Sequence, residues 1–234
     1  MTVAVPAGAD TVNNGGLPDW YIPLREAIYD QVLGSDEVFT LAQDVKKMAE
    51  AELSGVELLV MQSRCEYCVG RAYQFEKLDK RALPYYERAV TLAERAIAQK
   101  PSAAGYEMLA KNISQLCLLK STAWVMANGL KVEQNAKKAL ALDPRNAASQ
   151  YMIAARWVFG PGILGNPERG IKEMTAILAG GFDVQKDDFY NITSAIGYGY
   201  LRLKNKQEAR LWLEKAAQVY PDNIYIKEQL REAE

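Results

Sequence analysis

Apolar residues recur at helical spacing along the middle of the chain. Between residues 109 and 130 they step by three or four positions, which places them on one side of a helix. This stripe consists of Leu109, Ile113, Leu116, Leu119, Ala123, Met126 and Leu130. The spacing predicts one or two lengthened helices, broken near Asn128-Gly129. No segment of the chain shows a convincing strand pattern.

A second pattern repeats at intervals of tens of residues. Each copy has a charged pair, then an alanine, and then a proline five residues after the alanine. The copies are Glu94-Arg95-Ala96 with Pro101, Lys137-Lys138-Ala139 with Pro144, and Glu214-Lys215-Ala216 with Pro221. The alanine suits a close helix contact, and the proline suits the stop beyond a helix end. Such repetition indicates a stacked array, so we predict an all-α protein.

The last copy extends into a longer motif. Its members are separated by 3, 9, 7 and 5 residues, and they are Gly197, Tyr200, Ala209, Ala216 and Pro221. This spacing resembles the tetratricopeptide repeat (TPR), an antiparallel helix pair of about 34 residues. Thr193 stands where the TPR consensus has tryptophan. The resemblance places Gly197 and Ala209 where the two helices cross, so a leucine at position 197 should overpack the crossing.

The upstream units are less regular. We predict repeat-like units at about 58–101, 102–144, 146–180 and 187–221. In the first unit, Gly70 and Tyr73 match the motif, and about seven extra residues are predicted between Tyr73 and Ala89. The first helix of the third unit, at about 146–180, is interrupted by Phe159-Gly160-Pro161-Gly162, a run that cannot continue a helix. Its second helix should start with Asn166 as N-cap and Pro167 at the first position, with Gly170 in the small-residue place.

The ends of the array are predicted to differ from its repeats. A helical pair at 19–54 should form an N-terminal cap, and a helix at 222–234 should form a C-terminal one. Residues 1–18 are small, polar and Gly-rich, which predicts a disordered arm or the remnant of a removed signal. The expected architecture is thus a TPR-like α-α superhelix of about eleven helices, forming a single domain over 19–234.

Three short runs resemble a narrower group, the bacterial TPR proteins associated with TRAP-type periplasmic transporters. They are Gly-Arg-Ala-Tyr at 70–73, Tyr-Tyr-Glu-Arg-Ala-Val at 85–90 and Pro-Gly-x-x-Gly-Asn at 161–166. The resemblance covers roughly Leu58–Asp222. It implies an exported accessory protein that holds a ligand or partner in a groove. The chain as it stands predicts a cytoplasmic protein, and a periplasmic one if a signal has been removed.

Composition narrows the function. The chain has 28 basic and 29 acidic residues, which does not favour nucleic-acid binding. It has no histidine, which excludes a Ser–His or Cys–His nucleophile pair. The adjacent acids Asp187 and Asp188 fall where a helix N-cap is expected. We therefore predict no enzyme, no cofactor and no membrane-spanning segment, since no run of about 18 apolar residues occurs.

The three cysteines offer little chemistry. Cys65 and Cys68 form a C-x-x-C within a predicted helix, without the strand context of a redox motif. Cys117 would supply only a third ligand to zinc. Packing is the favoured interpretation, redox sensitivity stays open, and we predict no metal site. The glycines of 160–165 lack the Lys-Ser or Lys-Thr of a phosphate loop and are interpreted as a structural insertion.

The TPR resemblance implies that the first helix of each pair lines a concave groove. Transferring the family's groove positions by register gives a set rich in amide, aromatic and apolar side chains. The predicted groove consists of Arg64, Tyr67, Arg71, Gln74, Met108, Asn112, Gln115, Tyr151, Met152, Ala155, Phe159, Asn191, Ser194, Tyr198 and Arg202, with Phe75 also in register.

This groove is largely neutral and lacks the Lys, Asn and Arg clamp that some TPR domains use for a peptide carboxylate. It suits a protein or peptide partner with an apolar segment. The sequence therefore predicts a non-catalytic binding scaffold. The alternative is a transport-accessory protein that encloses a small amphipathic ligand in an apolar pocket. A homo-oligomer is left open.

Overall fold

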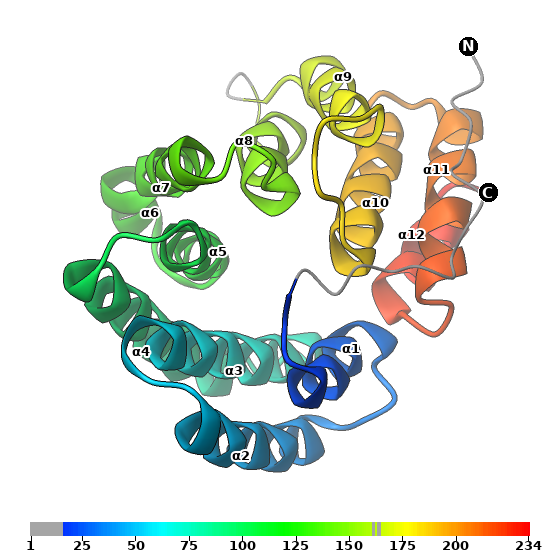
Figure 1. Ribbon diagram of the computed structural model, residues 1–234. Coiled ribbons are helices and arrows are strands. Elements are labelled where there is room, and N and C mark those ends of the chain that lie inside the picture. Colours follow the sequence, from blue (N-terminus) through cyan, green and yellow to red (C-terminus); the bar gives the residue numbers. More distant parts are fainter. Residues whose placement is uncertain (1–15, 161, 163–164) are drawn as a thin grey trace. The chain divides into compact units, whose positions relative to one another are not determined.

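The computed structural model describes residues 16–160, 162 and 165–234 (Figure 1). Within this part, every regular element is a helix, apart from an isolated bridge between Asn146 and Asp183. The helices are η1 (Asp19–Tyr21), α1 (Ile22–Asp30), α2 (Ser35–Glu52), α3 (Gly55–Phe75), α4 (Asp79–Gln99), α5 (Ala103–Leu119), α6 (Thr122–Asn128), α7 (Leu130–Leu142), α8 (Ala147–Phe159), α9 (Pro167–Leu178), α10 (Lys186–Arg202), α11 (Lys206–Val219) and α12 (Ile224–Glu232). The prediction of an all-α chain is confirmed.

The described helices belong to two compact units. The N-terminal unit, Pro18–Pro144, contains η1 and α1–α7, and the C-terminal unit, Arg145–Glu234, contains α8–α12. Because each unit is described by itself, a single domain over 19–234 stays a prediction. Most of the predicted arm at 1–18 lies outside the described residues.

The last repeat has the tight crossing that its glycine predicts. A Cβ atom at Gly197 would lie 2.6 Å from Cγ of Leu213 and 3.2 Å from the carbonyl oxygen of Ala209. Nothing larger than glycine therefore fits on α10 without displacing α11. In the α8–α9 pair, a Cβ at Gly170 would lie 2.5 Å from Cγ2 of Val158, which confirms Gly170 as the small residue of that crossing.

The first pair, α3 and α4, repeats the register of α10 and α11. In both pairs the same separations of 3, 9 and 7 residues join a glycine, a tyrosine and two buried alanines. The two sets are Gly70, Tyr73, Ala82 and Ala89, and Gly197, Tyr200, Ala209 and Ala216. Gly70 also faces the second helix, because its Cβ would lie 2.8 Å from the ring of Tyr86.

The turns of these two pairs match as well. Lys77 and Lys204 both adopt the left-handed region, with φ of 61° and 59°. The predicted insertion of about seven residues between Tyr73 and Ala89 is therefore wrong, since Ala82 holds the equivalent place. The extra residues lengthen the end of α4, which runs ten residues beyond Ala89, whereas α11 runs three beyond Ala216.

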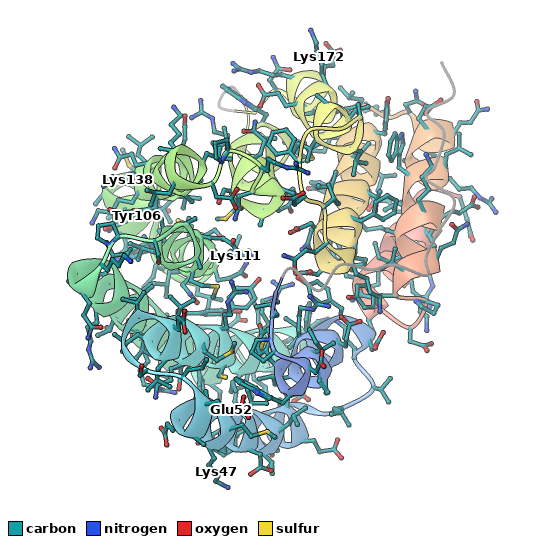
Figure 2. All side chains as sticks on the ribbon, in the orientation of Figure 1. Lys47, Glu52, Tyr106, Lys111, Lys138 and Lys172 are labelled. Carbon is teal, nitrogen blue, oxygen red and sulfur yellow. The ribbon has the colours of Figure 1, made fainter. Side chains whose placement is uncertain are left out.

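The lengthened stripe at 109–130 forms three helices rather than one or two. The expected break at Asn128-Gly129 is a single residue, because Gly129 separates α6 from α7 but keeps helical dihedral angles, and a full break at Lys120-Ser121 ends α5. Ser121 caps α6 by accepting a hydrogen bond from the backbone N–H of Trp124. Across the unit, α7 packs on α5, and the Lys138 ammonium lies 5.4 Å from the centroid of the Tyr106 ring (Figure 2).

Helix starts follow the capping rules that the sequence suggested. Asn166 accepts a hydrogen bond from the backbone N–H of Arg169 at 3.0 Å, with Pro167 at the first helical position, as predicted. Asn146 and Asn205 cap α8 and α11 in the same way. Each cap satisfies a backbone donor that would otherwise lack a partner.

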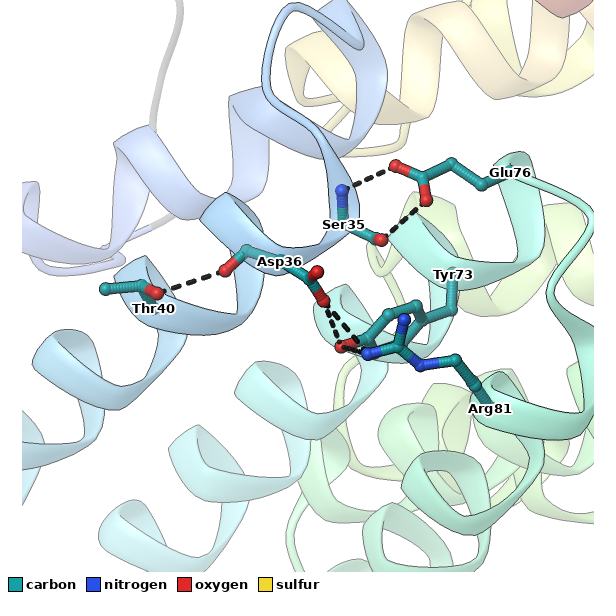
Figure 3. Close-up of polar contacts among 6 residues, drawn as sticks. All are labelled: Ser35, Asp36, Thr40, Tyr73, Glu76 and Arg81. Carbon is teal, nitrogen blue, oxygen red and sulfur yellow. Dashed lines mark hydrogen bonds and ion pairs between the residues drawn. The ribbon is translucent and has the colours of Figure 1, made fainter.

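Hydrogen bonds connect the N-terminus of α2 to the C-terminus of α3. The Glu76 carboxylate accepts bonds from the backbone N–H and the hydroxyl of Ser35, both at 2.6 Å (Figure 3). Beside it, Asp36 accepts a hydrogen bond from the Tyr73 hydroxyl at 3.0 Å and from Arg81 at 2.9 Å. Two carboxylates at the N-terminus of α2 also suit the helix dipole.

A buried carboxylate joins three helices of the N-terminal unit. Glu66 on α3 is 5% exposed, and it pairs with Lys46 from α2 and with Arg88 from α4, the latter at 2.8 Å. Burying a charge is costly unless it is paired. This pairing therefore fixes the neighbours of α3, and it lies within the segment that carries the C-x-x-C.

Candidate functional site

The predicted groove residues lie on the first helix of each pair. Seven belong to α3 and α5 in the N-terminal unit, and eight belong to α8 and α10 in the C-terminal unit. Within each unit the first helices are in contact, α3 with α5 and α8 with α10, so each group can form one continuous surface.

Four of the predicted residues are buried. They are Met108, Asn112, Met152 and Ser194, which are between 0% and 6% exposed. Met108 belongs to the apolar core between α3, α4 and α5, and the Asn112 amide donates a 2.7 Å hydrogen bond to the Met108 carbonyl. The surface that each unit offers to a partner is therefore formed by the other predicted residues.

In the N-terminal unit, an arginine links α3 to α5. Nη1 of Arg71 donates to Oε1 of Gln115 at 3.1 Å, and its guanidinium carbon lies 4.4 Å from the centroid of the Phe75 ring. These contacts fix a half-buried cation between an amide and an aromatic ring. The contacts of Arg71 on this side of α3 are thus made with an amide and with an aromatic ring.

Tyr86 from α4 is fully buried and supports Tyr67 and Gln74 of α3 from the core side. Its ring packs against Gly70 and lies 6.1 Å from that of Tyr67, and its hydroxyl donates to Oε1 of Gln74 at 2.9 Å. Burial raises the pKa of Tyr86 well above its ordinary value, so the hydroxyl stays protonated and keeps donating. Tyr86 was not among the predicted residues. The repeat register could have identified it, because Tyr86 follows Gly70 by the same number of residues as Leu213 follows Gly197, and each contacts that glycine.

In the C-terminal unit, two aromatic rings form the most exposed part of the predicted site. Phe159, the last residue of α8, stacks on Tyr198 of α10 with ring centroids 5.3 Å apart and an interplanar angle of 14°. Phe159 is 47% exposed, whereas Tyr198 is half-buried against the core. The Phe159 ring is therefore supported by Tyr198 on one face and remains partly accessible to solvent.

Arg202 holds this end of α8 in place. Its Nη1 donates to the carbonyl oxygens of Val158 and Gly160, the latter at 2.9 Å. These carbonyls belong to the C-terminus of a helix, where a cation is favourable. Arg202 is one of the predicted groove residues, and in the structure it fixes the backbone on either side of Phe159.

The remaining predicted residues are half-buried positions on the same first helices. Tyr151 and Ala155 on α8 are half-buried and pack against the core of the C-terminal unit. Asn191 on α10 and Arg64 on α3 are also half-buried. None of these positions brings an acidic side chain to the predicted surface.

The C-x-x-C is part of the core. Cys65 and Cys68 are both 0% exposed, and Sγ of Cys68 lies 3.6 Å from the Tyr21 hydroxyl. Burial raises the pKa of the Cys65 thiol, which disfavours the reactive thiolate. Within the described residues, no group of three or more His, Cys, Asp or Glu side chains is arranged to hold a metal ion.

The acidic pair at 187–188 serves the start of α10. Oδ2 of Asp188 accepts a hydrogen bond from the backbone N–H of Gln185 at 3.3 Å in a capping box. Both acids are buried. The N-cap of α10 is Gln185, so the expectation of an N-cap at this pair is wrong by two residues, and Asp187 and Asp188 occupy the second and third helical positions.

A second aromatic feature was not anticipated. The Trp157 ring lies 4.0 Å from the guanidinium of Arg156 and 3.9 Å from that of Arg169, which comes from α9. Arg169 also pairs with Glu173 at 2.7 Å. This cluster joins α8 to α9. The sequence did not predict it, because Trp157 and Arg169 are twelve residues apart and lie on different helices.

Comparison with known proteins identifies the fold. Neither a protein-family model nor a curated protein matches the sequence. A solved structure of a thermophilic TPR protein from Thermus thermophilus matches with a TM-score of 0.61 and 19% identity, covering 92% of this chain and 98% of that one. YrrB, a TPR protein with an unusual peptide-binding site, matches over the same shares with a TM-score of 0.41 and 15% identity. The fold is therefore TPR-like, as predicted. No described helix is long and apolar enough to cross a membrane.

Proposed function

We propose that this chain is a non-catalytic scaffold that binds an apolar segment of a partner protein on the first helices of its repeat pairs. These are α3 and α5 in the N-terminal unit and α8 and α10 in the C-terminal unit. The TPR-like fold supports this interpretation, because stacked helix pairs expose long surfaces for recognition. The lack of histidine and the capping role of Asp188 support the absence of catalysis.

The observation that carries the proposal is the stack of Phe159 on Tyr198. An exposed phenylalanine side chain usually keeps its rotamer freedom. Here the Phe159 ring stacks on Tyr198, and Arg202 fixes the backbone on both sides of Phe159, so the conformational freedom of the ring is restricted. Such bracing reduces the conformational entropy that a partner's binding would cost. An aromatic anchor of this kind is typical of residues that dominate binding energy at interfaces.

The chemistry around the anchor favours a neutral, apolar partner segment. In the C-terminal unit, α8 carries a single charged residue, Arg156. In the N-terminal unit, Gln74 and Gln115 accept hydrogen bonds through Oε1, and their NH2 groups can donate to an extended backbone. The helices α3, α5 and α10 each carry as many basic as acidic residues, so a strongly charged ligand would gain no net counter-charge from them. Nucleic acid is disfavoured for the same reason, since its recognition depends on basic surfaces.

A peptide selection tests the proposal. Peptides selected from a random library on the intact protein would be measured by fluorescence anisotropy against wild type and Phe159→Ala. We expect Phe159→Ala to weaken binding by about tenfold or more, as for an anchor worth over about 1 kcal/mol. The matched control is Leu211→Ala on α11, because Leu211 is 49% exposed in the same unit.

The two variants decide the outcome together. Equal binding by Phe159→Ala and wild type would contradict the placement of the site on α8 and α10. Native mass spectrometry of the purified chain tests the alternative. A co-purified small amphipathic molecule, released in Phe159→Ala and retained in Leu211→Ala, would favour the small-ligand function over a protein partner.

A further inference from the structure

The helix α6 in the N-terminal unit is apolar on both sides, which is unusual for a helix at a protein surface. Its sequence, Thr-Ala-Trp-Val-Met-Ala-Asn, contains no charged residue, and none of its residues is buried. Helices that are apolar all round are normally enclosed. Trp124 is half-buried and packs against the apolar core of the unit, whereas Ala123, Met126 and Ala127 on the opposite side are exposed within the described chain.

The uncovered side forms a continuous stripe. Gly129 has helical dihedral angles, φ −58° and ψ −35°, and its N–H donates to the Val125 carbonyl at 2.7 Å, so α6 runs into α7 almost without interruption. Residues three and four apart are neighbours on such a surface. The stripe consists of Ala123, Met126, Ala127 and Leu130, all exposed, with Met126 at 81% and Leu130 at 69%.

The stripe carries no charge that would select a charged partner. No Lys, Arg, Asp or Glu occurs from Ser121 to Leu130. The nearest charges on either side have partners within the chain, because Lys120 pairs with Glu87 and the Lys131 ammonium donates to the side-chain oxygen of Asn128 at 2.9 Å. A second copy of the same stripe would therefore meet an uncharged surface.

The order of side chains fits a second copy in antiparallel orientation. If a two-fold axis passes between Met126 and Ala127, Met126 of one copy faces Ala127 of the other, and Leu130 faces Ala123. Every large side chain then meets a small one, which allows the two helices to approach and interdigitate. Lys131 falls opposite the uncharged Thr122, so like charges do not meet. This complementarity of a surface with itself is the property that a two-fold interface requires.

We propose that the stripe of Ala123, Met126, Ala127 and Leu130 is a homodimer interface formed by α6 and the start of α7. The interface shares no residue with the proposed peptide site. A dimer would present two such peptide sites, one on each copy.

Sedimentation equilibrium over a dilution series of the full chain tests the dimer. Wild type is expected to show a reversible monomer–dimer equilibrium. Met126→Glu is expected to raise the dimer dissociation constant by at least about a hundredfold, because it places an unpaired carboxylate at the centre of the interface. The matched control is Met48→Glu on α2, where the methionine is 45% exposed, and it should leave the equilibrium unchanged.

A compensating variant tests the antiparallel geometry. In Met126→Glu with Ala127→Lys, each glutamate would face the lysine of the other copy, so the dimer should return. Adjacent residues on one helix do not face each other, so the rescue requires two chains. Wild type that sediments as a monomer at every concentration, or a dimer that tolerates Met126→Glu, would overturn the proposal. Thermal melts of all variants verify that the fold is retained.

Discussion

The crossing of α10 and α11 allows a quantitative test through Gly197→Leu. A Cβ atom at Gly197 would already lie 2.6 Å from Cγ and 2.7 Å from Cδ2 of Leu213, and Leu213 is 0% exposed and cannot move into solvent. Overpacking of this kind costs about 1–3 kcal/mol. Replacing a glycine within a helix returns about 0.8 kcal/mol in helix propensity. The net expected loss of stability is about 0.2–2.2 kcal/mol.

The clash itself can be isolated by a double-mutant cycle with Leu213→Ala. Alone, Leu213→Ala should cost about 2–5 kcal/mol, because it leaves a cavity in the core. In the double variant the leucine moves from α11 to α10, and the pair is larger than in wild type by only one methyl group. The combined loss should therefore be at least about 1 kcal/mol smaller than the sum of the two single losses.

Hydrogen exchange of α10 amides in increasing urea measures these losses for the C-terminal unit alone. This choice matters because the chain contains two units whose unfolding need not coincide. Losses that add to within about 0.5 kcal/mol would refute the reasoning, since independent sites behave in that way. An unchanged stability of Gly197→Leu would refute the placement of the crossing.

Further predictions concern charge, thiols, pH and the end of α8. Glu66→Gln should lower the free energy of unfolding by about 1–3 kcal/mol, measured in urea, because it breaks the buried pairing across α2, α3 and α4. In native protein, mass spectrometry after iodoacetamide treatment should find Cys117, which is half-buried, labelled before Cys65, which is fully buried; equal labelling would contradict the described core. Burial raises the pKa of Tyr73 to about 12 from its ordinary 10.0, so its contribution to stability is complete below pH 10 and is lost as pH rises towards 12. Tyr73→Phe should flatten the fall in melting temperature over that range, and an identical pH profile would count against it. Arg202→Ala should speed amide exchange at the end of α8 by removing two hydrogen bonds to carbonyl groups, at a cost of about 1–3 kcal/mol, while leaving exchange in α4 unchanged.

The sequence predicted the helix pairs because their determinants are local. Asn166 and Pro167 fix the start of α9, and Gly197 marks the α10–α11 crossing, so neither depends on distant parts of the chain. The same glycine rule, applied to Gly70, predicts its approach to α4. The error over seven extra residues arose because Ala89, which follows the Tyr-Tyr-Glu-Arg run, was matched to the wrong alanine.

The candidate site was harder to predict because burial depends on neighbouring helices. Positions 108 and 112 fit the family register, yet α3 and α4 enclose Met108, and the Asn112 amide donates to the Met108 carbonyl and to the Ser63 hydroxyl of α3. Arg202 could be placed at the end of α10 by register, but its bonds to carbonyls 44 and 42 residues away could not. The narrower resemblance to TRAP-associated TPR proteins stays a prediction.

The central claim, that a partner binds on the first helices of the pairs, is tested most directly by hydrogen–deuterium exchange with and without a selected peptide. We predict that a peptide bound to the C-terminal unit slows exchange in α8 and α10 around Phe159 and Tyr198, and that a peptide bound to the N-terminal unit slows exchange in α3 and α5. The second helices α4, α7, α9 and α11 should be unaffected. Protection confined to those second helices would contradict the account.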